Sequence, residues 1–161
     1  MSLIKILETF NKSAYLSWKR KNVTIRGMKD TQSENNAGAM LGRGLYTAFL
    51  SNKTLAKQYG TVYFVVGAIP KKPKVFNTLN EWEIWFYGNL VQPLFKNGEF
   101  PDARVFHSKT TIEAEMIKKG HDGIIIKGRE MVNFTPNMDE IRYYQNENQL
   151  IQHYEYIIEN K

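Results

Sequence analysis

The amino-acid sequence predicts an α+β fold built as a single domain over residues 1–161. Segments with helical spacing of apolar residues and short β-branched segments follow one another without the regular strand–helix alternation of α/β proteins. No internal repeat or interdomain linker divides the chain. The length suits one compact domain, and 42% hydrophobic and 24% charged residues are close to globular averages, so extensive disorder is not expected.

The N-terminal part is predicted to hold a helix, a strand and a long loop. Apolar residues at helical spacing predict an amphipathic helix over residues 3–18, which residues 19–22 end. β-branched residues predict a strand over 23–27. Residues 28–41 are rich in Asp, Ser, Asn and Gly and have no apolar period, so we expect a long loop of the kind that carries function or moves.

The remaining elements follow from the same signals. Short runs rich in β-branched or other apolar residues predict strands at 45–49, 61–69, 75–76, 122–127, 130–134 and 140–144. Apolar spacing, capping side chains and terminal glycines predict helices at 51–59, 79–96, 110–119 and 147–159. Residues 100–108 are expected to be irregular, and Gly128-Arg129 to form a tight turn.

Composition limits where the protein is expected to work and which catalytic groups it can use. Absence of cysteine excludes disulfides, thiolate metal sites and a cysteine nucleophile. The sequence has no apolar run of membrane-spanning length and no signal-peptide pattern, so we expect a cytoplasmic protein without a membrane partner, in a bacterial or phage-infected cell. The net charge of +6 suits an anionic partner or a plain solvated surface.

Common catalytic and nucleotide signatures are missing. His107, His121 and His153 lie far apart without ligand spacing, so no metal site is predicted. There is no G-x-S-x-G nucleophile elbow. Gly42 and Gly44 suggest a phosphate loop, but neither the Lys-Ser/Thr pair nor the third glycine of a dinucleotide fingerprint follows.

Three segments instead combine glycine with aromatic or charged side chains at strand ends. They are Ile25-Arg26-Gly27, residues 42–47 (Gly-Arg-Gly-Leu-Tyr-Thr) with Tyr59 beyond them, and residues 123–130, which end in Glu130. Glycine lets a ligand lie against the backbone, and tyrosine can stack on a flat heterocycle. A lone carboxylate can bind a sugar hydroxyl or stabilise developing positive charge.

In the order and spacing of these blocks the sequence resembles the ADP-ribosyltransferase superfamily. Arg26-Gly27 resembles the family's first strand, and residues 42–47 with 56–60 resemble its second strand and following helix. Residues 117–125 resemble the lead-in to the glutamate strand, and 130–136 that strand itself. The resemblance implies two small sheets around an NAD cleft, with an N-terminal and a C-terminal helix.

The resemblance also implies roles for individual residues. Glu130 would hydrogen-bond the ribose 2′-hydroxyl and stabilise the positive charge; Asp139 and Glu140 suit a turn and a strand start better. The implied catalytic residues are Glu130, Tyr46 and Arg26, and the implied NAD contacts are Arg26, Gly27, Gly44, Leu45, Tyr46, Thr47 and Tyr59.

The pattern is mixed between branches of that superfamily. Arg26 is typical of the bacterial-toxin branch, whereas Tyr46 resembles the poly(ADP-ribose) polymerase branch. The toxins' Ser-Thr-Ser motif is missing, and Gly128 stands where arginine-modifying members carry a second glutamate. The acceptor therefore stays open.

The expected function is transfer of ADP-ribose from NAD, as co-substrate, to a macromolecular acceptor, either protein or nucleic acid. The sequence leaves three alternative functions open. An NAD glycohydrolase would use water as the acceptor. An RNA 2′-phosphotransferase-like enzyme would need basic residues converging on a phosphate. A non-catalytic basic module would bind nucleic acid or protein through its charge.

Overall fold

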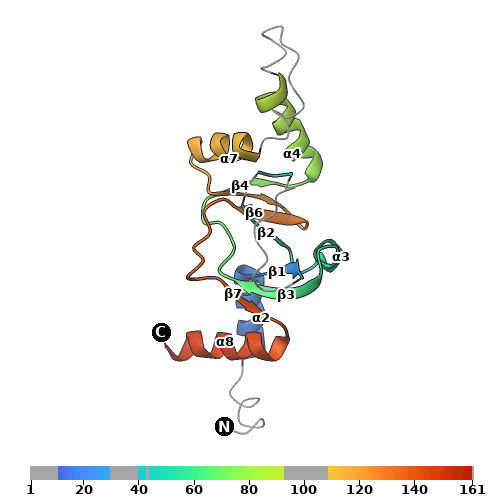
Figure 1. Cartoon of the computed structure of the whole chain (residues 1–161). Helices are drawn as coiled ribbons and strands as arrows, with labels where there is room; N and C mark the ends of the chain where they lie inside the picture. Colours follow the sequence, from blue (N-terminus) through green and yellow to red (C-terminus); the bar gives the residue numbers. More distant parts are fainter. Residues whose placement is uncertain (1–10, 30–39, 43, 93–108, 161) are drawn as a thin grey trace.

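A computed structural model describes residues 11–29, 40–42, 44–92 and 109–160. Its described residues form a seven-stranded mixed sheet with helices packed around it (Figure 1), which confirms the predicted α+β class. The strands are β1 (Val23–Met28), β2 (Leu45–Ala48), β3 (Thr61–Val66), β4 (Pro73–Phe76), β5 (Gly123–Ile126), β6 (Glu130–Asn133) and β7 (Arg142–Tyr144). The helical elements are α2 (Lys12–Asn22), α3 (Lys53–Lys57), α4 (Leu79–Phe86), the π-helix η1 (Tyr87–Val91), α7 (Lys109–Lys118) and α8 (Glu147–Glu159).

The sheet consists of two halves joined through the pair β1 and β2. The strand order is β4-β5-β6-β2-β1-β3-β7, and only β4 and β5 run parallel. β1 pairs with β3 along its whole length, but with β2 only at Ile25 and Ala48. The expected two small sheets are therefore one hydrogen-bonded sheet, whose halves diverge beyond this single residue pair.

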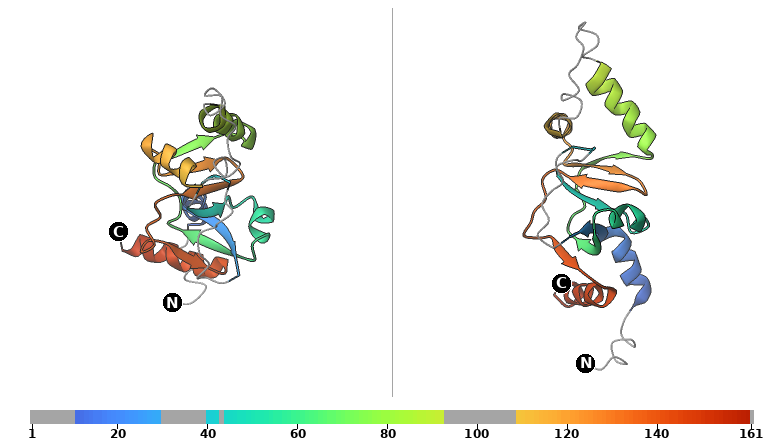
Figure 2. Two further views of the ribbon diagram at one scale, coloured as in Figure 1. Left: turned by 45° about the horizontal axis from the view of Figure 1, so that its top comes forward. Right: turned by 45° about the vertical axis from the view of Figure 1, so that its right-hand side comes forward.

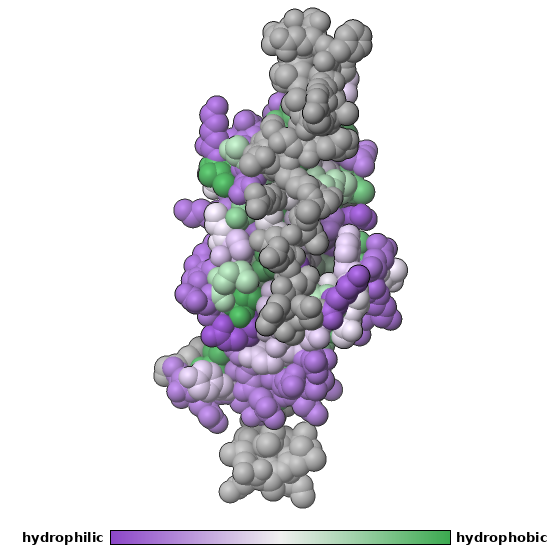
Figure 3. All heavy atoms as spheres, viewed as in Figure 1, coloured by the Kyte–Doolittle hydropathy of each residue, from purple (hydrophilic) through white to green (hydrophobic). Residues whose placement is uncertain are grey.

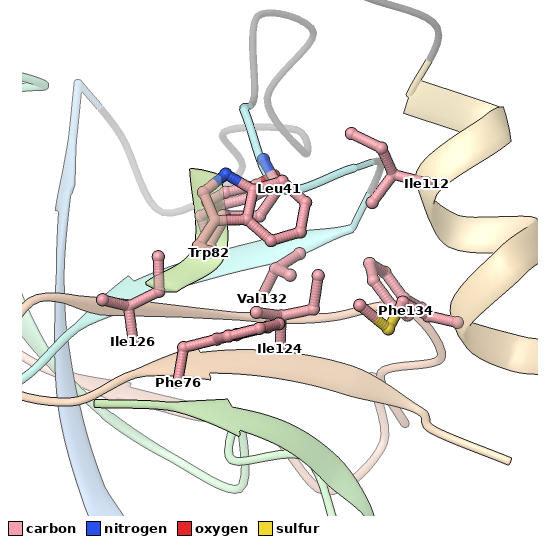
Figure 4. Close-up of a cluster of buried hydrophobic side chains, with 10 residues drawn as sticks. Leu41, Phe76, Trp82, Ile112, Ile124, Ile126, Val132 and Phe134 are labelled. Carbon is pink, nitrogen blue, oxygen red and sulfur yellow. The ribbon is translucent and has the colours of Figure 1, made fainter. Parts of the chain in front are cut away.

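Each half of the sheet has its own hydrophobic core. The half with β4, β5, β6 and β2 packs against α4 and α7 around the buried Trp82 and Val132 (Figure 4). The half with β1, β3 and β7 packs against α2 and α8 around Tyr15, Leu150 and Tyr154. Figure 2 shows the two helix pairs at opposite ends of the molecule.

The short helix α3 covers the junction between the halves. Its Ala56 packs with Ile25 of β1 and Ala48 of β2. A Cβ atom placed on Gly27 would lie only 1.7 Å from the Ala56 carbonyl oxygen. Glycine at position 27 is thus required by the close approach of α3 to β1.

Several predicted boundaries shift, each for a local reason. Helix α2 begins after Asn11, whose side chain accepts a hydrogen bond from the Ala14 N–H, and it runs on to Asn22 rather than ending at residue 18. Met28 belongs to β1, and β3 ends at Val66 because Gly67 adopts φ +88°. Residues 3–10, most of the expected loop 28–41, residues 93–96 and the irregular segment 100–108 lie outside the described residues.

The helix predicted over residues 79–96 changes character half-way. It starts as α4, with Thr78 as its cap, and continues as the π-helix η1. The Asn89 side chain donates a hydrogen bond of 2.8 Å to the Trp85 carbonyl, the acceptor that an α-helix reserves for the Asn89 N–H. Gly88 further weakens the α-helical preference at this point.

One face of the molecule is drawn in Figure 3 with its hydropathy. Hydrophilic side chains dominate the face shown in Figure 3, with only small hydrophobic areas among them. None of the helices in the described part of the chain is long and apolar enough to cross a bilayer.

The packing of α3 on β1 yields a stability prediction. Gly27→Ala should lower the free energy of unfolding by about 3 kcal/mol, because the new methyl group would overlap the backbone of α3. Urea unfolding followed by circular dichroism measures the change. Gly88→Ala is the matched control: nothing lies within 4 Å of its added Cβ, so it should be neutral or stabilise slightly. Equal stabilities of the two variants would contradict the described contact.

Candidate functional site

A pocket opens where β1 and β2 diverge beneath α3. Its walls are formed by strands β1 and β2, by helix α3 with Tyr59 two residues beyond its end, and by the first residue of β6. The lining residues are Ile25, Arg26, Gly27, Tyr46, Thr47, Ala48, Leu55, Ala56, Tyr59 and Glu130. The cavity volume is about 30 Å³, room for only a few water molecules, so a larger ligand lies across the mouth or displaces side chains.

Six of the eight residues proposed from the sequence line this pocket. They are Arg26, Gly27, Tyr46, Thr47, Tyr59 and Glu130. The two others lie outside its lining. Gly44 packs against β6, where a Cβ would come within 2.4 Å of the Asn133 carbonyl oxygen, and Leu45 is 1% exposed in a core cluster with Val65.

The sequence reasoning missed the apolar part of the lining. Ile25 and Ala48 flank the candidate residues on their own strands, and Leu55 and Ala56 face the sheet from α3. Ala56 belongs to the 56–60 block of the resemblance but was not proposed as a ligand contact, and the sequence signal for Leu55 is the apolar face of a very short helix. That signal places Leu55 in a core, but it does not say that this residue borders a pocket.

Glu130 enters the pocket from the start of β6. Gly128, at φ +72°, makes the tight turn before it, and the β2–β6 register sets Glu130 opposite Ala48. Its side chain is 13% exposed, and its Oε1 lies 3.4 Å from the Nε of the more exposed Arg129. Burial raises the pKa of the Glu130 carboxyl above its usual value, and Arg129 offsets part of this increase.

Arg26 spans the gap between the diverging strands. Its Nη1 donates a hydrogen bond of 2.7 Å to the Tyr46 carbonyl oxygen, although β1 and β2 have no backbone pair at this position. The side chain is only 5% exposed. Burial lowers the pKa of the guanidinium, and the electrostatic interaction with the neighbouring Tyr143 raises it in part. Arg26 therefore positions the pocket wall and offers little surface to a ligand.

The hydroxyl of Tyr46 is occupied by the protein. It accepts a hydrogen bond of 2.8 Å from the Leu41 N–H and donates one to the Gly42 carbonyl. Burial raises the pKa of the phenol, as do the nearby Glu130 and Tyr59. With 8% of its surface exposed, Tyr46 lines the pocket with its ring, and its hydroxyl stabilises the turn before β2.

Tyr59 and Thr47 differ in solvent exposure. Tyr59 follows α3 and is 52% exposed, so its ring can move at the pocket rim. Thr47 is buried, and its Oγ1 finds no hydrogen-bond partner among the described residues. Continuing the register of the Ile25–Ala48 pair would set Thr47 opposite Arg26.

No group of three or more His, Asp or Glu side chains in the described part of the chain is placed to hold a metal ion. His121 lies in the loop between α7 and β5, His153 lies on α8, and His107 falls outside the described residues. What the pocket offers chemically is one half-buried carboxylate beside two tyrosine rings and an apolar floor.

No protein-family model matches the chain, and no curated protein matches it significantly. It is similar to one solved structure, described as the crystal structure of an anti-CRISPR protein, with 12% sequence identity and a TM-score of 0.41. The match covers 75% of this chain and 93% of the other. A likeness of this degree carries no argument about fold or function.

The occupied hydroxyl of Tyr46 gives a second stability prediction. Tyr46→Phe should lower the free energy of unfolding by about 1–3 kcal/mol, because the Leu41 N–H and the Gly42 carbonyl lose their buried partner. Chemical denaturation measures the difference. Tyr59→Phe, which removes an exposed hydroxyl, should change it by less than about 0.5 kcal/mol. A neutral Tyr46→Phe substitution would show that the hydroxyl is not needed by the turn.

Proposed function

We propose that this chain is a mono-ADP-ribosyltransferase that uses NAD as co-substrate. The observation that carries the proposal is the convergence on one pocket of three segments that are far apart in the sequence. Arg26-Gly27, Tyr46-Thr47 with Tyr59, and Glu130 come from the three segments that the sequence pattern indicates, and all of them line this pocket. Because burying a carboxylate costs free energy, packing alone does not favour placing Glu130 beside these residues.

In the proposed reaction the bond between C1′ of the ribose and the nicotinamide nitrogen breaks. The bonding electron pair leaves with nicotinamide, which becomes neutral, and positive charge develops on C1′ and the ring oxygen. A lone pair of the acceptor then forms the new bond to C1′, and the acceptor's proton passes to water. With water itself as the acceptor the same steps give NAD hydrolysis.

Glu130 has the central role in this proposal. Its carboxylate binds the ribose 2′-hydroxyl and stabilises the positive charge of the transition state, an interaction that strengthens where water is excluded. Tyr59 at the rim stacks on the nicotinamide ring, and the Tyr46 ring forms the wall behind it. The backbone of Gly27 lies beside them for contact with the carboxamide.

Arg26 receives a different role from the one expected of it. The resemblance implied that it is a catalytic residue in direct contact with NAD. Since its side chain is 5% exposed and bonded to the Tyr46 carbonyl, we assign it the positioning of β2 against β1. Gly44 and Leu45 likewise have a positioning role without touching NAD. Gly44 allows β2 to pack closely on β6, and Leu45 anchors β2 in the core.

Two of the alternatives fit the lining less well. A 2′-phosphotransferase needs several cations around a phosphate, but the only basic residue in the described lining is Arg26. A polyanion in the pocket itself would meet the carboxylate of Glu130. An NAD glycohydrolase shares the proposed chemistry and differs only in the acceptor.

Substitution of Glu130 tests the mechanism. Glu130→Gln keeps the size of the side chain but removes its charge, and we expect nicotinamide release from NAD to fall by about 10²- to 10³-fold. Chromatography of nicotinamide measures the rate. Glu140→Gln changes an exposed acid at the start of the segment leading into β7 and should leave the rate within about twofold. Undiminished turnover by Glu130→Gln would refute the role assigned to this carboxylate.

The pKa of Glu130 predicts the acid limb of the pH profile. Catalysis needs the carboxylate, and burial raises its pKa above the ordinary value of 4.5. As the pH falls through this raised pKa, Glu130 takes up a proton, so kcat/KM should decline with a midpoint above pH 4.5. The residual activity of Glu130→Gln should lack this limb. A midpoint at or below 4.5 in the unmodified protein would mean that another group is responsible.

A further inference from the structure

The chain segments that form α2, β1, β2 and α3 carry basic residues but no acidic ones. Residues 11–29 and 40–60, which form α2, β1, β2 and α3, contain no Asp or Glu. Most acids lie on other elements, such as Glu81 and Glu83 on α4. Glu147 of α8 is the exception, because it contacts Lys19 of α2 and the charge of Lys53 helps to lower its pKa. The net charge of +6 is therefore unevenly distributed over the fold.

We define the basic face by the exposed cations of α2 and α3. These are Lys12, Arg20, Lys21, Lys53 and Lys57. None of them forms an ion pair with a carboxylate in the described part of the chain. Lys19, by contrast, is neutralised by Glu147 at 2.8 Å.

A groove connects α2 with the segment leading to α3. It is lined by Ser13, Leu16, Lys19, Arg20 and Leu50 and has a cavity volume of about 410 Å³. Leu16 is 41% exposed in it, so the groove offers apolar surface between cations. Both helices lie on the same side in the right-hand view of Figure 2, and α3 leads to Tyr59 at the pocket rim.

We propose that the basic face binds a single strand of nucleic acid. A strand needs cations along its phosphates and apolar and aromatic surface for its sugars and bases. The basic face supplies unpaired cations on two successive helices, the groove around Leu16, and the exposed ring of Tyr59 at its end. The groove places the apolar Leu16 and Leu50 beside Lys19 and Arg20, so sugars and bases can lie on the leucines while phosphates face the cations.

Binding is tested without NAD, so its outcome is independent of the proposed reaction. Fluorescence anisotropy with a labelled mixed-sequence strand of ~20 nucleotides, as DNA and as RNA, measures affinity over a range of salt concentrations. The unmodified protein should bind, and its affinity should fall steeply as salt increases. The double variant Arg20→Glu/Lys57→Glu should lose at least about tenfold in affinity, and its log–log salt slope should fall by about 1 to 1.5.

A matched control separates this face from net charge alone. Lys72→Glu/Lys118→Glu reverses two exposed cations outside the basic face, with the same change in total charge, and should lose less than about threefold. Arg20→Gln/Lys57→Gln, a milder pair, should weaken binding in the same direction as the reversal, and circular dichroism shows whether each variant is folded.

Three results would overturn the proposal. The first is absence of binding to both strands, and the second is an equal loss in the control and test variants. The third is equally tight binding of a polyglutamate peptide of similar length, which would identify an acidic protein as the partner class. Retained binding by Glu130→Gln would support the proposal, because it would place the strand on the basic face even in a protein that no longer cleaves NAD.

Discussion

The hydrogen bond from the Arg26 guanidinium to the Tyr46 carbonyl connects β1 and β2 at a point where the two strands no longer form backbone hydrogen bonds. β1 and β2 are paired only at Ile25 and Ala48, and beyond that point the 2.7 Å contact from Nη1 takes the place of the ladder. A side chain reaches farther than a backbone N–H, so the strands can diverge without leaving the carbonyl unsatisfied. The divergence is what opens the pocket.

The same junction explains which residues meet there. Side chains alternate along a strand, so the β2–β6 register that pairs Tyr46 with Val132 also sends Ala48 and Glu130 to their common face. A slip by one residue would turn the carboxylate to the other side of the sheet. Helix α3 closes the junction by resting on Gly27, so the position of Tyr59 depends on a residue without a side chain.

Local sequence signals predicted most elements, because caps and turns act over a few residues. Helices α4 and α8 start at the predicted residues 79 and 147, and Gly128 makes the expected turn. The sequence could not show that β1 is buried at every position, because its alternating polar residues Thr24 and Arg26 are typical of a solvent-facing side. Nor could it show that the Tyr46 hydroxyl is used by Leu41 and Gly42, or that Leu45 packs away from the pocket. These facts depend on strand register and on the turn before β2, which a single sequence does not encode in any periodic pattern.

Two acidic residues show how surroundings separate a structural carboxylate from a candidate functional one. Burial alone would raise the pKa of Glu147, but hydrogen bonds from Lys19 and Tyr15 outweigh it and lower the pKa. Glu130 has only the exposed Arg129 at 3.4 Å, and its pKa is raised. The charge of Glu147 therefore stabilises the contact between α2 and α8, whereas the charge of Glu130 costs free energy in the folded state. A carboxylate kept at such a cost in a pocket is a candidate for chemistry that requires it. Residues 11–29 and 40–60, which supply most of the lining, contain no acid, and Glu130 is the one acidic group of the described lining. A cation that developed in the pocket would therefore be stabilised by this carboxylate.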